Sequence, residues 1–132
     1  MPLSDVDLEG LILEIAQKTQ LVSPVKINVV YGIDNDAIKD DLKINLYRII
    51  QEQMNNILKH AEAMQVDIII ELHAGMLNVM ITDDGKGFNT TKKVNGIGLS
   101  NIINRVESFD GKVKITSTPG NGCSLEIQIP VQ

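Results

Sequence analysis

Three stretches with helical periodicity alternate with five short strand-like segments, and this order restricts the chain to few folds. Apolar residues recur every three or four positions over 4–18, 37–62 and 97–108, which is typical of amphipathic helices. The strand-like segments, β-branched or alternating apolar and polar, are 25–31, 66–72, 76–82, 112–118 and 124–131. Because an amphipathic helix must cover an apolar surface, this order predicts an α+β two-layer sandwich. In it, the helices cover one face of a largely antiparallel sheet.

Polar and turn-forming residues mark the expected ends of these elements. Ser4 and Asp5 are the predicted N-caps of the first helix, and Ser23-Pro24 is expected to end it. The short spacing around His73-Ala74-Gly75 predicts a hairpin between the second and third strands. His73 is therefore expected at the surface, as turn residues usually are.

Length and composition indicate one globular domain over residues 1–132. Hydrophobic residues make up 43% of the chain, which has no Trp and only two Tyr and two Phe, so the core must be mainly aliphatic. Cys123 is the only cysteine, which excludes an intrachain disulfide, and it cannot by itself form a structural zinc site. We expect its thiol to fill a small space near a strand.

The charge of the chain disfavours two classes of partner. The net charge is −5, which argues against nucleic acid or an anionic membrane as the main partner. No apolar run approaches the roughly 18 residues that span a bilayer, and the N-terminus does not resemble a signal peptide. We therefore expect a cytoplasmic chain without direct membrane contact, whether or not a longer parent is membrane-anchored.

The stretch 81–101, ITDDGKGFNTTKKVNGIGLSN, carries the densest chemistry. An apolar run leads into Asp83 and Asp84, and glycines follow at Gly85 and Gly87. Carboxylates at a strand end accept hydrogen bonds from a base or bind a cation, and glycines let a ligand approach the backbone. A second glycine pair then precedes a predicted helix start, where phosphate binds readily. Together these features predict a nucleotide pocket.

A polar stripe on the long predicted helix is a second candidate. Glu52, Asn56 and Lys59 are spaced by four and three residues, so they project from neighbouring positions. A carboxylate can orient or deprotonate a ligand, an amide oxygen can bind Mg²⁺, and a lysine can meet phosphate. A solvated polar helix face has the same pattern, so the stripe by itself does not identify a site.

The second glycine pair does not fit the best-known nucleotide motifs. Gly96 and Gly98 lack the Lys-Ser/Thr that follows the glycines of a P-loop, and they lack the order of a dinucleotide-binding fingerprint. Taken alone, each motif also fits a surface turn.

Four motifs in order resemble one known family. QEQMNNILKHA, DDGKGF, GIGLSNIINRVE and TPGNGCSLEIQIP are similar to the ATP-binding catalytic domain of bacterial sensor histidine kinases, within the GHKL ATPases. The resemblance covers nearly the whole chain, most firmly 46–130, and implies the Bergerat fold. Only seven residues lie between Phe88 and Gly96, which suits the nitrate-sensor or desaturase-sensor subgroup with its short ATP lid.

The resemblance implies a role for each matching position around the base and the metal. Asp83 would bind the adenine amino group, and Gly85 and Gly87 would shape the base pocket. Asn56 would coordinate Mg²⁺. Asn55 is its immediate neighbour, but the four-residue spacing from Glu52 favours Asn56.

The remaining implied roles concern catalysis and the phosphates. Glu52 would orient water or a ligand, and Lys59 would act on the phosphates together with His60. Ser124 would touch the adenine edge through water. Phosphates would be held at the helix start by Gly96 and Gly98 with the backbone amides of Leu99 and Ser100. In the lid before it, Lys92 and Lys93 would either reach a phosphate or be solvated loop charges.

The implied reaction is transfer of the γ-phosphoryl group of Mg²⁺-ATP to a histidine on a separate dimerisation domain. Neither His60 nor His73 resembles that acceptor, so we expect a catalytic domain that lacks its dimerisation domain and is monomeric. A response regulator would act downstream. Two alternatives share the fold: a serine kinase that inhibits a sigma factor, and a nucleotide-dependent interaction module without turnover.

Overall fold

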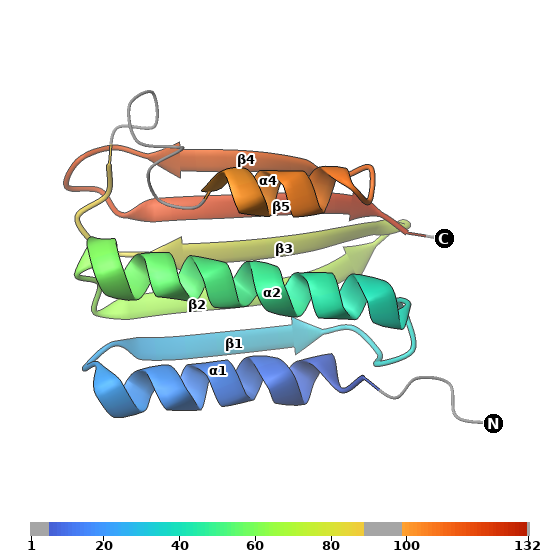
Figure 1. The fold of residues 1–132 in the computed structure, drawn as a ribbon, viewed down its shortest axis with the longest axis horizontal. Coiled ribbons are helices and arrows are strands. Elements are labelled where there is room, and N and C mark those ends of the chain that lie inside the picture. Colours follow the sequence, from blue (N-terminus) through green and yellow to red (C-terminus); the bar gives the residue numbers. More distant parts are fainter. Residues whose placement is uncertain (1–5, 89–98, 132) are drawn as a thin grey trace.

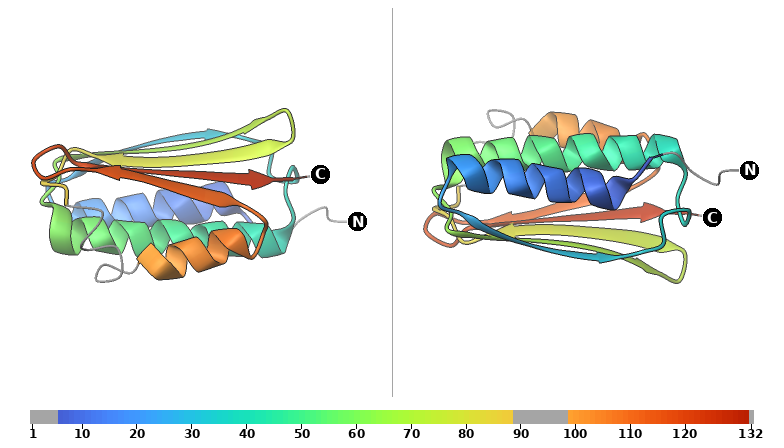
Figure 2. Two further views of the ribbon diagram at one scale, coloured as in Figure 1. Left: turned by 90° about the horizontal axis from the view of Figure 1, so that it is seen from above. Right: turned by 90° about the horizontal axis from the view of Figure 1, so that it is seen from below.

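The computed structural model describes residues 6–88 and 99–131 as a sheet packed under three helices (Figure 1). In chain order the elements are α1 (Leu8–Val22), β1 (Lys26–Gly32), α2 (Asp40–Asn56), the π-helical turn η1 (Ile57–Ala61), β2 (Gln65–His73), β3 (Met76–Asp83), α4 (Leu99–Glu107), β4 (Lys112–Ser117) and β5 (Cys123–Pro130). Two side views show the helices on one face of the sheet and none on the other (Figure 2). The predicted α+β two-layer sandwich is confirmed.

The sheet has the strand order β1-β2-β3-β5-β4 and is mixed. β1 and β2 are parallel and are connected through α2, whereas the other neighbouring pairs are antiparallel. Strands β2 and β3 form the predicted hairpin. The path of the chain brings the ends of α2 and β3 and the starts of α4 and β5 to one end of the molecule, on the left in Figure 1.

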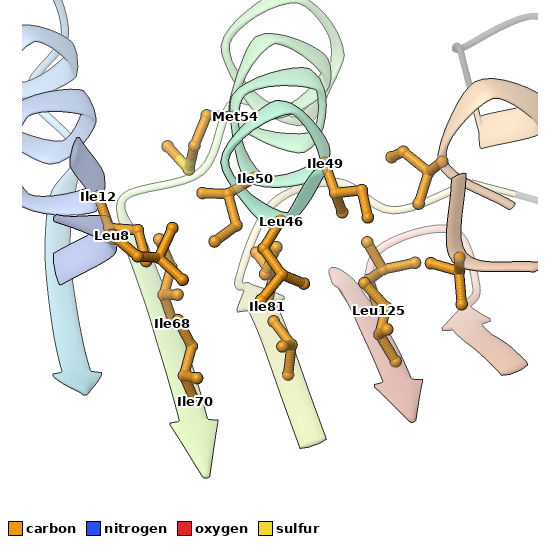
Figure 3. Close-up of a cluster of buried hydrophobic side chains, with 14 of the residues drawn as sticks. Leu8, Ile12, Leu46, Ile49, Ile50, Met54, Ile68, Ile70, Ile81 and Leu125 are labelled. Carbon is orange, nitrogen blue, oxygen red and sulfur yellow. The ribbon is translucent and has the colours of Figure 1, made fainter. Parts of the chain in front are cut away.

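Aliphatic side chains fill the space between the two layers (Figure 3). Leu46 and Ile50 on α2 are fully buried, and so are Ile68 on β2 and Ile81 on β3. Each such side chain stabilises the fold by about 1.5–3 kcal/mol through removal of apolar surface from water. The predicted aliphatic core therefore holds α2 rigidly across the central strands, with its last turn at the left end of the sheet in Figure 1.

The first helix begins later than the sequence predicts. Its N-cap is Asp7, whose Oδ1 accepts a 3.0 Å hydrogen bond from the backbone N–H of Gly10. The prediction of Ser4 and Asp5 as caps is wrong, and both residues lie outside the described part of the chain. Gly10 leaves room for the Asp7 carboxylate, which lies where a Cβ of residue 10 would be.

The long predicted helix changes its geometry at its C-terminal end. Regular α-helix ends at Asn56, the next five residues form η1, and Glu62 then takes a left-handed conformation with φ 54°. π-Helical turns are rare and often occur at functional sites. The wider turn also means that side chains after Asn56 do not continue the 3.6-residue stripe seen in the sequence.

The hairpin turn is tighter than its sequence suggests. Ala74 and Gly75 both have positive φ, at 52° and 77°, and His73 forms the last cross-strand pair with Met76. His73 is exposed, as expected, but it ends β2 rather than lying in the turn. Over the described residues, no helix combines the length and apolarity needed to cross a membrane.

Candidate nucleotide-binding site

A pocket opens at the end of the sheet where η1, β3, β5 and the start of α4 meet. Five of the predicted site residues line it: Asn56, His60, Asp83, Gly87 and Leu99. Six further residues, for which no binding role was predicted, complete the described lining: Gln53, Ile57, Ala61, Lys86, Phe88 and Cys123. The pocket therefore combines an apolar floor with amide, imidazole, carboxylate and ammonium groups, as small-molecule sites typically do.

Asp83 is the carboxylate that faces this pocket. It ends β3, is half-buried, and its Oδ1 accepts a 2.8 Å hydrogen bond from the backbone N–H of Gly85. Desolvation by burial raises the pKa of Asp83, and the neighbouring charge of Asp84 adds to the effect, although the Gly85 bond opposes it. The remaining lone pairs of a desolvated carboxylate favour a ligand that donates hydrogen bonds.

Asp84 has a different task, although it is the next residue. Its Oδ1 accepts hydrogen bonds from the backbone N–H groups of Met64 (2.8 Å) and Gln65 (2.9 Å). These two bonds lower the pKa of Asp84, which lies at the surface. Asp84 therefore connects the start of β2 to the loop after β3 through hydrogen bonds, and it is not part of the described pocket lining.

The two glycines after Asp84 allow backbone contacts that a side chain would block. A Cβ at Gly85 would collide with the carbonyl oxygen of Ala61. Gly87 has φ +64°, and a Cβ there would collide with the carbonyl oxygen of Thr118. The sequence motif D-x-G-x-G is thus explained by close packing of the loop between η1 and the β4–β5 turn.

Ser117 holds the far end of this loop. Its Oγ accepts a 2.9 Å hydrogen bond from the backbone N–H of Phe88 and donates a 2.7 Å bond to the carbonyl oxygen of Gly122. The side chain is buried. Sequence reasoning placed Ser117 in a strand without a role, because its two partners are 29 and 5 residues away and no local pattern indicates them.

Asn56 projects into the pocket from the last residue of α2. Its Nδ2 donates a 3.3 Å hydrogen bond to Oε1 of Gln53, one turn earlier on the same helix. Gln53 also lines the pocket although it is only 3% exposed. Asn55, the alternative magnesium ligand, is exposed and is not among the described residues of the lining.

The polar stripe predicted on the helix is divided between different places. His60 lines the pocket from η1, whereas Lys59 is exposed and is not part of the described lining. Glu52 lies in a separate polar groove between α2 and α4, beside Arg48 and Arg105. Although Glu52 lies one helical turn before Asn56, it lines this groove and is not part of the described pocket lining.

Cys123 occupies the wall position that the sequence suggests for Ser124. Asp83 pairs with Cys123 across β3 and β5, and Thr82 pairs with Ser124. Because successive strand residues point to opposite faces, Cys123 faces the helices and the pocket, and Ser124 faces the open side of the sheet. Burial and the charge of Asp83 raise the pKa of the Cys123 thiol to about 11, so it stays protonated at neutral pH.

Of the residues predicted to bind phosphate near the start of α4, the structure describes only the last two. Leu99, the first residue of α4, is buried and lines the pocket, and Ser100 is exposed. The other predicted residues of this region lie outside the described part of the chain: Lys92, Lys93, Gly96 and Gly98.

Comparison with known proteins identifies relatives of this chain. Residues 41–132 match the family described as histidine kinase-, DNA gyrase B-, and HSP90-like ATPases. The sensor histidine kinase LiaS of Bacillus subtilis is 28% identical over 106 residues, which are 80% of this chain and 29% of that protein. The signal transduction histidine-protein kinase/phosphatase DegS of Brevibacillus brevis is 37% identical over 97 residues, 73% of this chain and 25% of that protein.

Solved structures agree at the level of the fold. The histidine kinase domain of the blue-light activated histidine kinase from Erythrobacter litoralis superposes with a TM-score of 0.81 at 19% identity, covering 99% of this chain and 65% of that one. The chain spans less than a third of the length of the two relatives named above. With the family match extending over most of the sequence and the pocket lying within it, the chain belongs to the histidine kinase-, DNA gyrase B- and HSP90-like ATPases.

Proposed function

We propose that this chain binds Mg²⁺-ATP in the pocket between η1, β3 and α4 and is the catalytic domain of a sensor histidine kinase. In this proposal a separate dimerisation domain provides the histidine that receives the γ-phosphoryl group. Family membership implies ATP as the nucleotide. The names of the similar proteins, a sensor histidine kinase and a histidine-protein kinase/phosphatase, support histidine over serine as the acceptor.

The proposal rests on the different environments of two adjacent carboxylates, Asp83 in the pocket and Asp84 at the surface. Asp83 is partly desolvated at the pocket wall and keeps acceptor capacity after its bond to Gly85. An adenine amino group is a donor that fits this carboxylate, and the apolar side chains of Ile57 and Leu99 border the same space. We infer that the Asp83 carboxylate accepts a hydrogen bond from the adenine amino group at this position.

Asn56 fits the role of a magnesium ligand. Mg²⁺ prefers oxygen ligands and usually takes only one or two from the protein, with phosphates and water completing the shell. The Asn56 amide lies at the pocket wall with its Nδ2 engaged by Gln53, which leaves the Oδ1 oxygen as the atom available to a cation. A bound Mg²⁺ would neutralise phosphate charge in a chain whose own net charge is negative.

Glu52 and Lys59 lie beside the pocket and not in its described lining, so we assign them to the approach of the acceptor rather than to nucleotide binding. His60, which faces the pocket, is proposed to contact the nucleotide. Gly96 and Gly98 remain proposed phosphate-binding positions. We further propose that this domain is monomeric, acts in the cytoplasm, and serves a pathway with a response regulator downstream.

Calorimetric titration of the chain with ATP in Mg²⁺ tests the nucleotide assignment. Asp83→Asn replaces a charged acceptor and should weaken binding by about 10–100-fold, the equivalent of about 1.5–3 kcal/mol. Asp84→Asn is the matched control, because its amide oxygen can still accept from Met64 and Gln65. Failure of the folded wild-type chain to bind ATP, or equal losses in both variants, would overturn the assignment.

A phosphoryl-transfer assay then distinguishes the alternatives. The chain is incubated with radiolabelled ATP and with a histidine-containing dimerisation domain supplied as a separate polypeptide. Acid-labile labelling of that domain supports a histidine acceptor, and acid-stable labelling of a serine-containing partner supports the serine-kinase alternative. ATP binding without transfer to either acceptor would favour the interaction module.

A further inference from the structure

Gln53 is a polar side chain in an otherwise apolar row. The neighbouring inward-facing residues of α2 and η1 are Ile49, Ile50, Met54 and Ile57, all of which are buried. A buried amide without a partner costs about 1–3 kcal/mol, so an amide at such a position needs a compensating contact. The contact that the structure provides is the bond to Asn56.

This contact differs from those of the other buried polar side chains in the described part of the chain. Thr19, Lys43 and Ser117 each donate to a backbone carbonyl oxygen. Gln53 instead accepts from the side chain of Asn56, the proposed magnesium ligand. The partner of Gln53 is therefore a site residue and not the backbone.

The hydrogen bond also fixes the orientation of the Asn56 amide. An asparagine amide has its oxygen and its amino group on opposite sides, and rotation about its last bond is weakly restricted. A cation requires the oxygen, and an amino group turned toward it would be repelled. Because Gln53 Oε1 holds the amino group, Asn56 Oδ1 is directed away from Gln53.

We propose that Gln53 is a positioning residue that holds the Asn56 amide with its oxygen facing the cation of bound Mg²⁺-ATP. The inference rests on the proposed function, because it needs Asn56 to bind the cation. Residues that orient a metal ligand typically contribute about 10–100-fold to metal affinity. Gln53 is attached to the rigid core by its burial on α2, which makes it a firm support for a ligand at the end of that helix.

The test compares two affinities of the same chain: for ATP with saturating Mg²⁺ and for ATP in EDTA. Their ratio isolates the contribution of the cation. Gln53→Met keeps the length and removes the acceptor oxygen, and it should reduce the ratio by about 10-fold, the low end for this class of residue. Because Gln53 also lines the pocket, the affinity for ATP in EDTA is measured as the reference, and it should fall less than the affinity with Mg²⁺.

Three further variants make the result specific. Gln51→Met is the matched control, because Gln51 is exposed on the same helix and should leave the ratio unchanged. Gln53→Glu keeps an acceptor for Asn56 Nδ2 and should retain the Mg²⁺ enhancement. In an Asn56→Ala background, which itself lowers the ratio, Gln53→Met should cause no further loss.

The outcomes separate this inference from the proposed function. If Gln53→Met lowers affinity equally with and without Mg²⁺, or leaves the ratio intact, the positioning role is overturned while ATP binding stands. Loss of the enhancement in Gln53→Glu would also overturn it, because the acceptor is still present. If Asn56→Ala leaves the ratio of the wild type, the magnesium assignment itself fails.

Discussion

The carbonyl oxygen of Ala61 accepts a 2.7 Å hydrogen bond from the backbone N–H of Lys86. The last residue of η1 is thereby joined to the middle of the loop after β3. Gly85 lies against the same carbonyl group. The end of the long helix and the carboxylate at the end of β3 are therefore held in one rigid arrangement around the pocket.

Gly85→Ala is expected to disturb this arrangement. The new Cβ would collide with the Ala61 carbonyl oxygen, so the loop must move away from η1. We expect a loss of about 1–3 kcal/mol in the free energy of unfolding, as for overpacked sites, together with a large loss of ATP affinity. Chemical denaturation and calorimetric titration measure the two effects.

Gly120→Ala is the control for this substitution. Gly120 has φ +85°, but no atom lies within 4 Å of the place that a Cβ would occupy. The cost is therefore backbone strain of about 1–2 kcal/mol without displacement of the loop. ATP affinity should persist in this variant. Equal affinity losses at the two glycines would contradict the role given to the Ala61 contact.

Asp83→Asn is expected to stabilise the fold while it weakens ATP binding. Burial raises the pKa of Asp83 in the folded state, so the folded chain binds its proton more tightly than the unfolded chain does. The contribution of Asp83 to the free energy of unfolding is full below the unfolded-state pKa of 3.8. It is lost as the pH rises through the higher pKa of the folded state. At pH 7 the Asp83→Asn variant should have the higher Tm.

Thermal unfolding of both proteins from about pH 3 to pH 7 measures this effect. The difference in Tm should shrink as the pH falls and the wild-type carboxyl group becomes protonated. A lower Tm for Asp83→Asn at pH 7 would mean that the carboxylate stabilises the apo fold, contrary to this expectation.

Asp84 is expected to behave in the opposite way. Hydrogen bonds from Gln65 and Met64 lower its pKa, so its stabilising contribution is full above the unfolded pKa and is lost as pH falls through the folded pKa. Asp84→Ala should destabilise the chain at pH 7 by about 1 kcal/mol, because a surface site is screened by water.

The measurement is the denaturant midpoint of wild type and Asp84→Ala at pH 7 and at a pH well below 3.8, where the two should converge. Asp67→Ala is the control, because Asp67 on β2 is a carboxylate whose described hydrogen bond comes from a side chain, that of Gln65, and not from backbone N–H groups. A midpoint difference that does not depend on pH would argue against the hydrogen bonds of the ionised carboxylate as its cause.

Ser117→Ala is expected to loosen the loop that carries the pocket residues. It leaves the N–H of Phe88 and the carbonyl oxygen of Gly122 without their shared partner. The expected cost is about 1–3 kcal/mol, and ATP affinity should fall because Phe88 lines the pocket. Ser108→Ala removes an exposed hydroxyl group and should change neither quantity.

Local patterns in the sequence were sufficient for the elements and their order. Alternating or β-branched residues predicted the strands that became β2 and β3, and apolar recurrence over 37–62 predicted a helix whose Leu46 and Ile50 are buried in α2. These features follow from the repeat of the backbone, so a short window contains all the information. The same holds for Gly87, because a turn after a strand favours glycine wherever φ is positive.

The tertiary structure gives adjacent residues different environments. Which of Asp83 and Asp84 faces the pocket, and whether Cys123 or Ser124 lines it, depends on the pairing of β3 with β5 and on the approach of β2. A shift of one residue in strand register reverses the face of every side chain. Alternation in each strand puts Asp83 on the face of Ile81 and Cys123 on the face of Leu125, but it does not show that these two positions lie opposite each other.

The chain by itself thus determined the layers, the strands and the chemistry available at one end of the sheet, because periodicity and residue type act locally. The tertiary structure decided how that chemistry is divided: Asp83 at the pocket wall, Glu52 in the groove beside it, and Gln53 under Asn56. The places of Asp83 and Glu52 depend on contacts between segments distant in sequence, whereas the bond between Gln53 and Asn56 is local and gains its setting from the burial of Gln53 in the core.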